Sequence, residues 1–176
     1  MKYTVANIAA NNLCCSCGTC AAICPTEAIR MKTSRGLVLP EVQSQKCNRC
    51  QLCIKSCPGY SVDFEELNLK IYGQQPQKAS LGNYLKCYFG HSTNDDIRYN
   101  SASGGIVTQL LISALENHVI DGALVTRMKQ DDPLRSEAFI ARTKEEVISA
   151  SKTKYCPVGA NNSLRRSSKK MGGTQL

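Results

Sequence analysis

Apolar residues in the second half of the chain follow the spacing of one helical face. They recur three or four positions apart. We expect this helix to end near residues 117–118. The residues on the apolar face are Ile106, Leu110, Leu111, Ala114 and Leu115.

Shorter elements are predicted on both sides of this helix. Residues 93–98 begin with Thr-Asn-Asp-Asp, which is typical of the start of a short helix. Thr143 and Glu146 form a capping box for another helix, extending through Ser149. An order of strand, helix and strand predicts a sheet with parallel pairing. The runs that favour strands are residues 84–90, 119–127 and 138–141.

The rest of the chain lacks this periodicity. Residues 61–83 are polar and interrupted by glycine and proline, which favours a linker. Residues 163–176 are polar and basic, which predicts a disordered tail. The chain therefore divides into a first unit at 1–60, the linker, an α/β region at 84–162, and the tail.

Two cysteine runs of identical spacing lie in the first unit. Each reads Cys-x2-Cys-x2-Cys-x3-Cys-Pro, which is the spacing of bacterial double-cluster ferredoxins. Three thiolates can wrap one 4Fe-4S cube, and the fourth, expected on a short helix, reaches the other cube. We expect one cluster on Cys14, Cys17, Cys20 and Cys57, and another on Cys47, Cys50, Cys53 and Cys24. The predicted fold class is an α+β ferredoxin-like double-cluster domain followed by a partial α/β domain.

Zinc and disulfides are the alternative interpretations of these cysteines. Structural zinc needs only four ligands and usually separates its Cys-x2-Cys pairs by a dozen or more residues, so it has no use for the third and fourth cysteine of each run. Disulfides require an oxidising compartment, and the chain starts without the apolar segment of a secretion signal. Cys15 lies outside the spacing and is interpreted as a structural or tolerated thiol.

Composition narrows the class of protein further. The formal net charge is +8, but each oxidised cube with its four thiolates carries about −2, so two cubes would halve that excess. The aromatic residues that nucleic-acid readers interleave with basic ones are missing, so we expect no nucleic-acid partner. Residues 105–115 are too short and too polar to cross a bilayer. We expect a cytoplasmic protein without membrane insertion.

A second candidate site is the small-residue loop before the 106–115 helix. Ser101, Ser103, Gly104 and Gly105 would let backbone amides approach a ligand closely at a helix N-terminus. This loop could hold a phosphate of a nucleotide cofactor. An ordinary helix cap is the alternative, because neither a GxGxxG nor a GxxxxGK[ST] string is present.

Several short strings, taken together, resemble the family of coenzyme F420 hydrogenase/dehydrogenase beta subunits. The resemblance covers about residues 10–162. It starts with the two cysteine runs and continues in the same order through the α/β region. The later strings are residues 88–93, 95–98, 101–105, 121–123, 141–146 and 154–158.

This resemblance implies an FAD-linked oxidoreductase. Flavin can accept a hydride from a two-electron carrier such as coenzyme F420 and pass the electrons on singly to 4Fe-4S clusters. By position, Ser101, Ser103, Gly104 and Gly105 would contact FAD, and Lys154 and Tyr155 would lie near the flavin or the coenzyme. The resemblance assigns no catalytic residue to this chain.

Members of this family continue beyond the point at which this sequence ends. We therefore expect either a C-terminally truncated member of the family or a member that a second chain completes. We also expect a redox partner subunit or protein, and therefore a hetero-oligomer. A simple ferredoxin-like electron-transfer module and an inactive fragment remain as alternatives.

Overall fold

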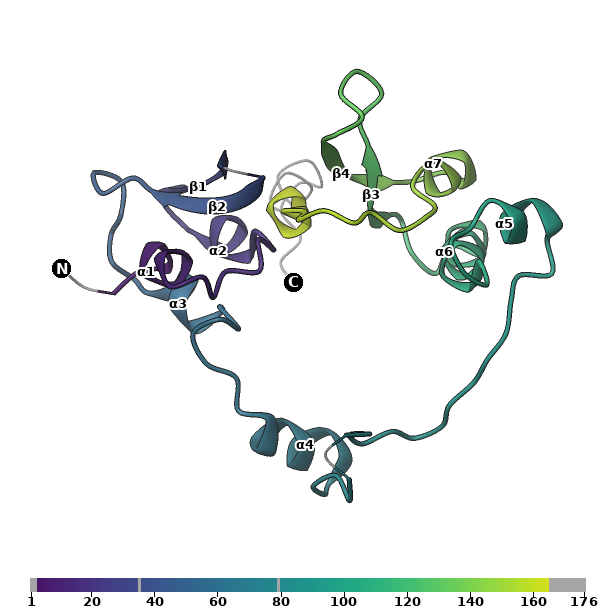
Figure 1. Ribbon diagram of the computed structural model, residues 1–176, viewed down its shortest axis with the longest axis horizontal. Coiled ribbons are helices and arrows are strands. Elements are labelled where there is room, and N and C mark those ends of the chain that lie inside the picture. The colour runs from purple at the N-terminus through teal and green to yellow at the C-terminus, as the bar shows by residue number, and fades with distance from the viewer. Residues whose placement is uncertain (1–2, 35, 79, 165–176) are drawn as a thin grey trace.

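The computed structural model describes residues 3–34, 36–78 and 80–164. Figure 1 shows two groups of elements, one from each half of the chain, joined by a long connection that carries a single helix. The elements in chain order are α1 (Val5–Ala10), α2 (Thr19–Ile23), β1 (Ile29–Ser34), β2 (Leu37–Val42), α3 (Leu52–Lys55), α4 (Phe64–Tyr72), α5 (Asp95–Tyr99), α6 (Ile106–Glu116), β3 (Ala123–Met128), β4 (Ser136–Ala141), α7 (Lys144–Ser149) and the 3-10 helix η1 (Ala160–Ser163).

The first group packs three short helices against a β-hairpin. Strands β1 and β2 pair antiparallel, with Ile29 opposite Val42. Val5 and Ile8 of α1 are almost fully buried and share a small core with Ala21 and Ile54 from α2 and α3. The same core includes Cys20 and Cys24, so the cysteine runs are part of the packing and are not mere surface loops.

The second group packs α5, α6 and α7 around another antiparallel hairpin. Its core brings together Ile97 of α5, Ile112 of α6, Ala141 of β4 and Val147 of α7. Strands β3 and β4 pair antiparallel. The parallel pairing predicted from the order of strand, helix and strand is therefore wrong, because residues 84–90 join neither sheet and β3 pairs with β4 across a short hairpin connection.

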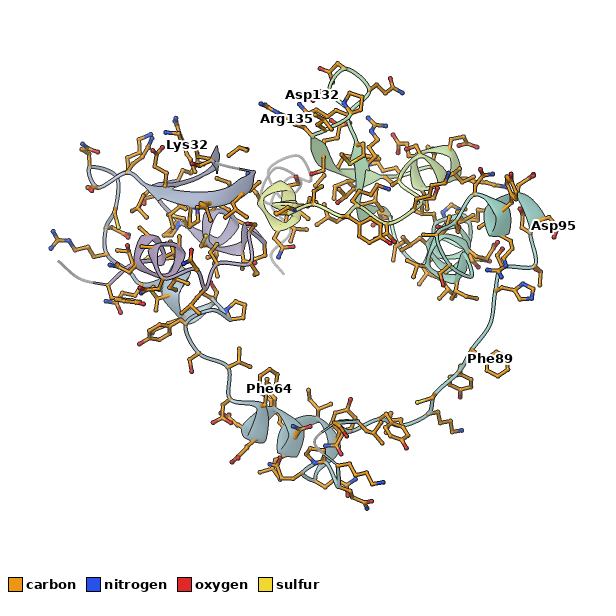
Figure 2. All side chains as sticks on the ribbon, in the orientation of Figure 1. Lys32, Phe64, Phe89, Asp95, Asp132 and Arg135 are labelled. Atoms are coloured by element: carbon orange, nitrogen blue, oxygen red, sulfur yellow. The ribbon has the colours of Figure 1, made fainter. Side chains whose placement is uncertain are left out.

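The strand predicted at residues 84–90 is also wrong. Within the described chain this segment is extended but belongs to neither sheet. Leu85 is 88% exposed and Phe89 is fully exposed, and Figure 2 shows the Phe89 ring projecting from the connection. β-propensity reflects packing against neighbouring strands, and this segment has no neighbouring strand.

The local helix predictions are confirmed in type and extent. The apolar face predicted for the 106–115 helix is wrong in part, because Ile106 and Leu110 are exposed and Ile112 is the buried residue. The helix expected to end near residues 117–118 is α6, and the one expected at 93–98 is α5, capped by Asn94, whose Oδ1 accepts from the Ile97 N–H at 3.0 Å. Thr143 caps α7 by accepting a hydrogen bond from the Glu146 N–H. The predicted strands at 119–127 and 138–141 correspond to β3 and β4, with shifted ends.

The segment predicted to be a linker contains α4, a helix that was not expected from the sequence. Asp63 caps this helix by accepting from the Glu66 N–H at 2.9 Å. No residue of α4 is buried, and Phe64 at its start is exposed (Figure 2). The helix is thus a local structure within a connection that packs little against either group.

The 3-10 helix η1 joins the two groups by non-covalent contacts. It lies between the β1–β2 hairpin and the β3–β4 hairpin (yellow in Figure 1). On one side the Ser163 hydroxyl donates to the Ala138 carbonyl of β4 at 3.2 Å, and on the other the Asn161 N–H donates to the Cys17 carbonyl at 3.1 Å. Ser163 was predicted to start the disordered tail, but it belongs to η1, and residues 165–176 lie outside the described residues.

Among the helices of the described ranges, none has the length and apolar character needed to cross a membrane.

Candidate functional site

The two cysteine runs have the same backbone conformation. In the first run, Ser16 and Gly18 have positive φ on either side of Cys17, and in the second run Arg49 and Gln51 have positive φ on either side of Cys50. Residues other than glycine rarely adopt this conformation, so three such residues at matched positions indicate a functional constraint. Alternating backbone handedness turns successive N–H groups inward, and such concave loops hold many iron-sulfur sites.

Each loop leads directly into a short helix. Gly18 is the N-cap of α2 and Gln51 is the N-cap of α3. The third cysteine of each run lies in the first turn of its helix, and the fourth lies just beyond the last helical residue. Helices α2 and α3 pack against one another. Cys24, just beyond α2, lines a cavity together with cysteines of the other run.

Cys14, Cys17 and Cys20 form the first group of thiols. Burial, together with the neighbouring Cys17 and Cys14, raises the pKa of Cys20 to about 12. Burial also acts to raise the pKa of Cys17, but hydrogen bonds from Thr19 and neighbouring groups outweigh it, so the Cys17 pKa falls below its usual value. The Thr19 hydroxyl lies 3.3 Å from Cys17 Sγ.

The second group combines the other run with a cysteine from the first. Cys24, Cys47, Cys50 and Cys53 line one cavity. Burial raises the pKa of Cys53, and Cys24 and Cys47 are close enough to raise it further. For Cys24, burial is outweighed by hydrogen bonds, with Thr26 Oγ1 at 3.7 Å from Sγ and the Ala28 N–H donating at 3.3 Å, so its pKa is lowered.

The thiols around this cavity have the donor chemistry of a cubane cluster. A tetrahedral zinc site would instead gather four sulfurs within about 3.8 Å of each other around one ion. A cube offers a separate iron to each thiolate, so its ligands can surround a cavity, as Cys24, Cys47, Cys50 and Cys53 do.

Two other cysteines differ in their surroundings. Cys57, the predicted fourth ligand of the first group, is half-buried against the N-terminal core. It is absent from the lining of the cavity formed by the second group. Cys15, interpreted as a spare thiol, is exposed. Both placements are compatible with the predicted ligand sets, which stay a prediction.

The small-residue loop before α6 lines a cavity of about 310 Å³. Gly104 is required there by space, because an added Cβ would lie 2.5 Å from the Gly90 carbonyl oxygen. Gly105 has φ +73° and is the N-cap of α6 without a side-chain cap. The Ser101 hydroxyl donates to the Ile97 carbonyl at 2.7 Å, and Arg98 donates to the Ser103 carbonyl at 2.8 Å, which fixes the shape of the loop.

Lys154 and Tyr155 do not line this cavity. The Lys154 ammonium donates to the carbonyls of Ala150, Ser151 and Lys152 beyond the end of α7. Burial, with the nearby Lys152 charge, lowers its pKa. Tyr155 is 95% exposed. The structure thus places Lys154 on the backbone that supports the cavity wall.

Several residues at both sites were not expected from the sequence. Lys152 lines the cavity beside the small-residue loop. Thr19 and Thr26 contact cysteine sulfurs, each from two positions after the cysteine concerned. That repeated Cys-x-Thr spacing is visible in the sequence and could have identified both threonines.

Comparisons with known proteins agree with this division of the chain. Residues 13–61 match the family model described as a 4Fe-4S dicluster domain. Residues 87–165 match the model described as coenzyme F420 hydrogenase/dehydrogenase, beta subunit, N-terminal part. The two matched segments contain the two candidate sites.

Parts of the chain are also similar to relatives whose curated names refer to coenzyme F420. A 75-residue stretch is 37% identical to coenzyme F420 hydrogenase subunit beta of Methanosarcina barkeri and covers 43% of this chain and 25% of that protein. An F(420)H(2) dehydrogenase subunit of Methanosarcina mazei is 25% identical over 167 residues, which cover 88% of this chain and 42% of the relative. Coenzyme F420-dependent sulfite reductase of Methanocaldococcus jannaschii is 25% identical over 167 residues, 94% of this chain and 23% of the relative.

This chain spans less than half the length of each of these three relatives. The two matched segments follow one another along the chain with no overlap. Residues 87–165 are thus similar to the N-terminal part of the coenzyme F420 hydrogenase/dehydrogenase beta subunits, and residues 13–61 are similar to 4Fe-4S dicluster domains.

Proposed function

We propose that this chain is an iron-sulfur oxidoreductase subunit. It relays electrons between a flavin-linked two-electron carrier of the coenzyme F420 class and a redox partner through two 4Fe-4S clusters. The observation that carries the proposal is the meeting of Cys24 with Cys47, Cys50 and Cys53 around one cavity, in a chain that also matches the F420 family.

The cluster-binding part would adopt a double-cluster ferredoxin-like fold. Cys14, Cys17, Cys20 and Cys57 would hold one cluster, and Cys47, Cys50, Cys53 and Cys24 the other. When bound, each cluster accepts and releases single electrons. The crossing of Cys24 and Cys57 would tie the two clusters into one unit. Thiols that serve as ligands must stay reduced, which supports a cytoplasmic location.

The flavin would occupy the cavity beside α6. Ser101, Ser103, Gly104 and Gly105 would approach its phosphates through backbone N–H groups at the start of the helix, where the helix dipole favours an anion. Lys152, on the same cavity wall, would add a positive charge. Lys154 would act indirectly by holding the backbone of that wall. Coenzyme F420 would then be the substrate and FAD the resident cofactor.

A partner subunit would complete the system. Many apolar side chains along the connection between the two groups are exposed, among them Phe64, Leu85 and Phe89. An exposed apolar patch often marks a protein–protein contact. This supports a hetero-oligomer in which a redox partner exchanges electrons with the clusters.

The test is anaerobic reduction of the full chain after reconstitution with iron, sulfide and FAD. Reduced coenzyme F420 is expected to bleach the visible absorbance of the clusters, because their sulfur-to-iron transitions weaken when the cube takes up an electron. The matched control is the same protein reconstituted without FAD, which should bleach with dithionite but not with reduced F420.

A simple electron-transfer module is the second candidate, favoured by the exposure of Tyr155 away from the cavity. It predicts clusters that dithionite bleaches but no retained FAD, and no response to reduced F420 with or without FAD. That outcome would contradict the flavin-linked function while leaving the clusters in place.

A further inference from the structure

A side chain of η1, in the second group of elements (hereafter the second domain), forms a hydrogen bond to the first cysteine run. Asn161 of η1 donates from Nδ2 to Thr19 Oγ1 at 2.8 Å, across 142 residues of sequence. Thr19 Oγ1 lies 3.3 Å from Cys17 Sγ. Three residues therefore form a chain of contacts that leads from the F420-family segment to a cysteine sulfur.

In this chain of contacts only one assignment of hydrogen-bond donors and acceptors is possible. A hydroxyl has one proton to donate and two lone pairs to accept with. Asn161 Nδ2 can only donate, so it occupies a lone pair of Thr19 Oγ1 and leaves the hydroxyl proton for another acceptor. A ligating cysteine is a thiolate, which has no proton to give, so the Thr19 hydroxyl must donate to Cys17 Sγ.

The backbone keeps this contact in place. The Asn161 N–H donates to the Cys17 carbonyl at 3.1 Å, on the same loop. Gly18, between Cys17 and Thr19, has φ +82°, and a Cβ added there would lie 3.0 Å from the Asn162 nitrogen. The close approach of η1 to this loop thus depends on a glycine that also provides the turn.

The second cysteine run lacks an equivalent contact. Its residue in the position of Thr19 is Leu52, which has no hydrogen-bonding side chain. The two clusters would therefore differ in the hydrogen bonds to their sulfurs, although the backbones of the two runs repeat. Hydrogen bonds to sulfur are among the factors that set cluster potential.

We propose that Asn161 is a positioning residue that holds the Thr19 hydroxyl on Cys17 Sγ and thereby raises the reduction potential of the cluster bound by Cys14, Cys17 and Cys20. The donor stabilises the negative charge that reduction adds, so its loss disfavours the reduced state. This inference rests on the proposed presence of clusters. It goes further because it makes the potential of one cluster depend on the docking of the second domain.

The experiment is an anaerobic redox titration of the reconstituted full chain, followed by EPR. In Asn161→Ala, the ratio of reduced to oxidised cluster at fixed potential should fall about threefold for one of the two clusters, which corresponds to a shift of about −28 mV for a one-electron couple. Thr19→Val should shift the same cluster in the same direction. Adding Asn161→Ala to Thr19→Val should produce no further shift, because Asn161 acts through the hydroxyl.

Three further variants separate positioning from other effects. Asn161→Asp keeps the size of the side chain but can only accept, so the hydroxyl would turn from sulfur to the carboxylate and the potential should fall at least as far as in Asn161→Ala. Asn162→Ala removes the neighbouring amide from the same helix and should leave both potentials unchanged. Thr19→Ser keeps the hydroxyl and should keep the potential of the unmodified protein.

Unchanged potentials in Asn161→Asp and Thr19→Val, with full iron and sulfide content, would overturn the inference and leave the proposed function standing. An equal shift in Asn162→Ala would also overturn it, because the effect would then come from the segment as a whole. A failure of the unmodified chain to bind iron and sulfide would refute the proposed clusters themselves.

Discussion

The cysteines of the first run differ in their surroundings. Cys24 and Cys15 lie in the same run, yet Cys24 is buried at the cavity with Cys47, Cys50 and Cys53, whereas Cys15 is exposed. The sequence spacing and the structural surroundings therefore both favour Cys24 over Cys15 as a cluster ligand. The two residues form a matched pair for substitution.

We expect Cys24→Ser to lose about half of the bound iron and sulfide, since one of two clusters loses a thiolate ligand. Cys15→Ser should keep the full amount. Iron and acid-labile sulfide analysis of anaerobically reconstituted protein measures both.

The same substitutions test the crossing of Cys24 between runs. Cys24→Ser and Cys53→Ser should each retain the same cluster and therefore have the same EPR spectrum. Cys17→Ser should retain the other cluster and have a different spectrum. If Cys24→Ser instead matched Cys17→Ser, each run would hold its own cube and the crossed assignment would be wrong.

The sequence predicts those site residues that lie close to one another along the chain. The cysteine spacing specifies thiols within a few positions of each other, and the small residues at 101–105 specify a loop that approaches its surroundings closely. The contact between Asn161 and Thr19 could not be predicted this way, because it depends on how two distant segments dock. The contacts of Lys154 with the carbonyls of Ala150 and Ser151 were likewise not expected from the sequence.

At the scale of elements, the helix α6 positions the candidate flavin loop by packing one face into the second core. Ile112 is 2% exposed in that core, whereas Leu110 on the same helix is 63% exposed. The two side chains are of equal size and differ mainly in burial.

We expect Ile112→Ala to lower the free energy of unfolding of the second domain by about 2–5 kcal/mol, because it removes buried methyl groups and leaves a cavity. Leu110→Ala should change it by less than about 0.5 kcal/mol, as is usual for exposed positions. Urea unfolding followed by circular dichroism measures both, and equal losses would contradict the packing of α6 described above.

Elements that form through local signals were predictable, and those that need distant partners were not. Asn94 and Thr143 cap α5 and α7 through hydrogen bonds to N–H groups three residues further along the chain, so the sequence alone indicated these helices. Residues 84–90 have β-propensity but lack a partner strand in the described chain, and the pairing of β3 with β4 follows from their short connection. The helix α4 was not predicted because its turn-forming neighbours dominate the composition of residues 61–83.

At the scale of the whole molecule, two small domains share few contacts beyond those of η1. Each has its own core, and the N-terminal core includes Cys20 and Cys24. A core this small gives limited stability by itself, so cluster binding and folding of the first domain should be coupled. With the proposed clusters bound, the cysteine runs would be both the redox centre and the main source of cohesion of that domain.

The double-cluster assignment is tested by the metal and sulfide content of the full chain, reconstituted anaerobically with iron and sulfide in the presence of equimolar zinc. We expect about eight irons and eight acid-labile sulfides per chain, with little zinc, because two cubes use all eight spaced cysteines. Binding of zinc without sulfide at these cysteines would contradict the assignment.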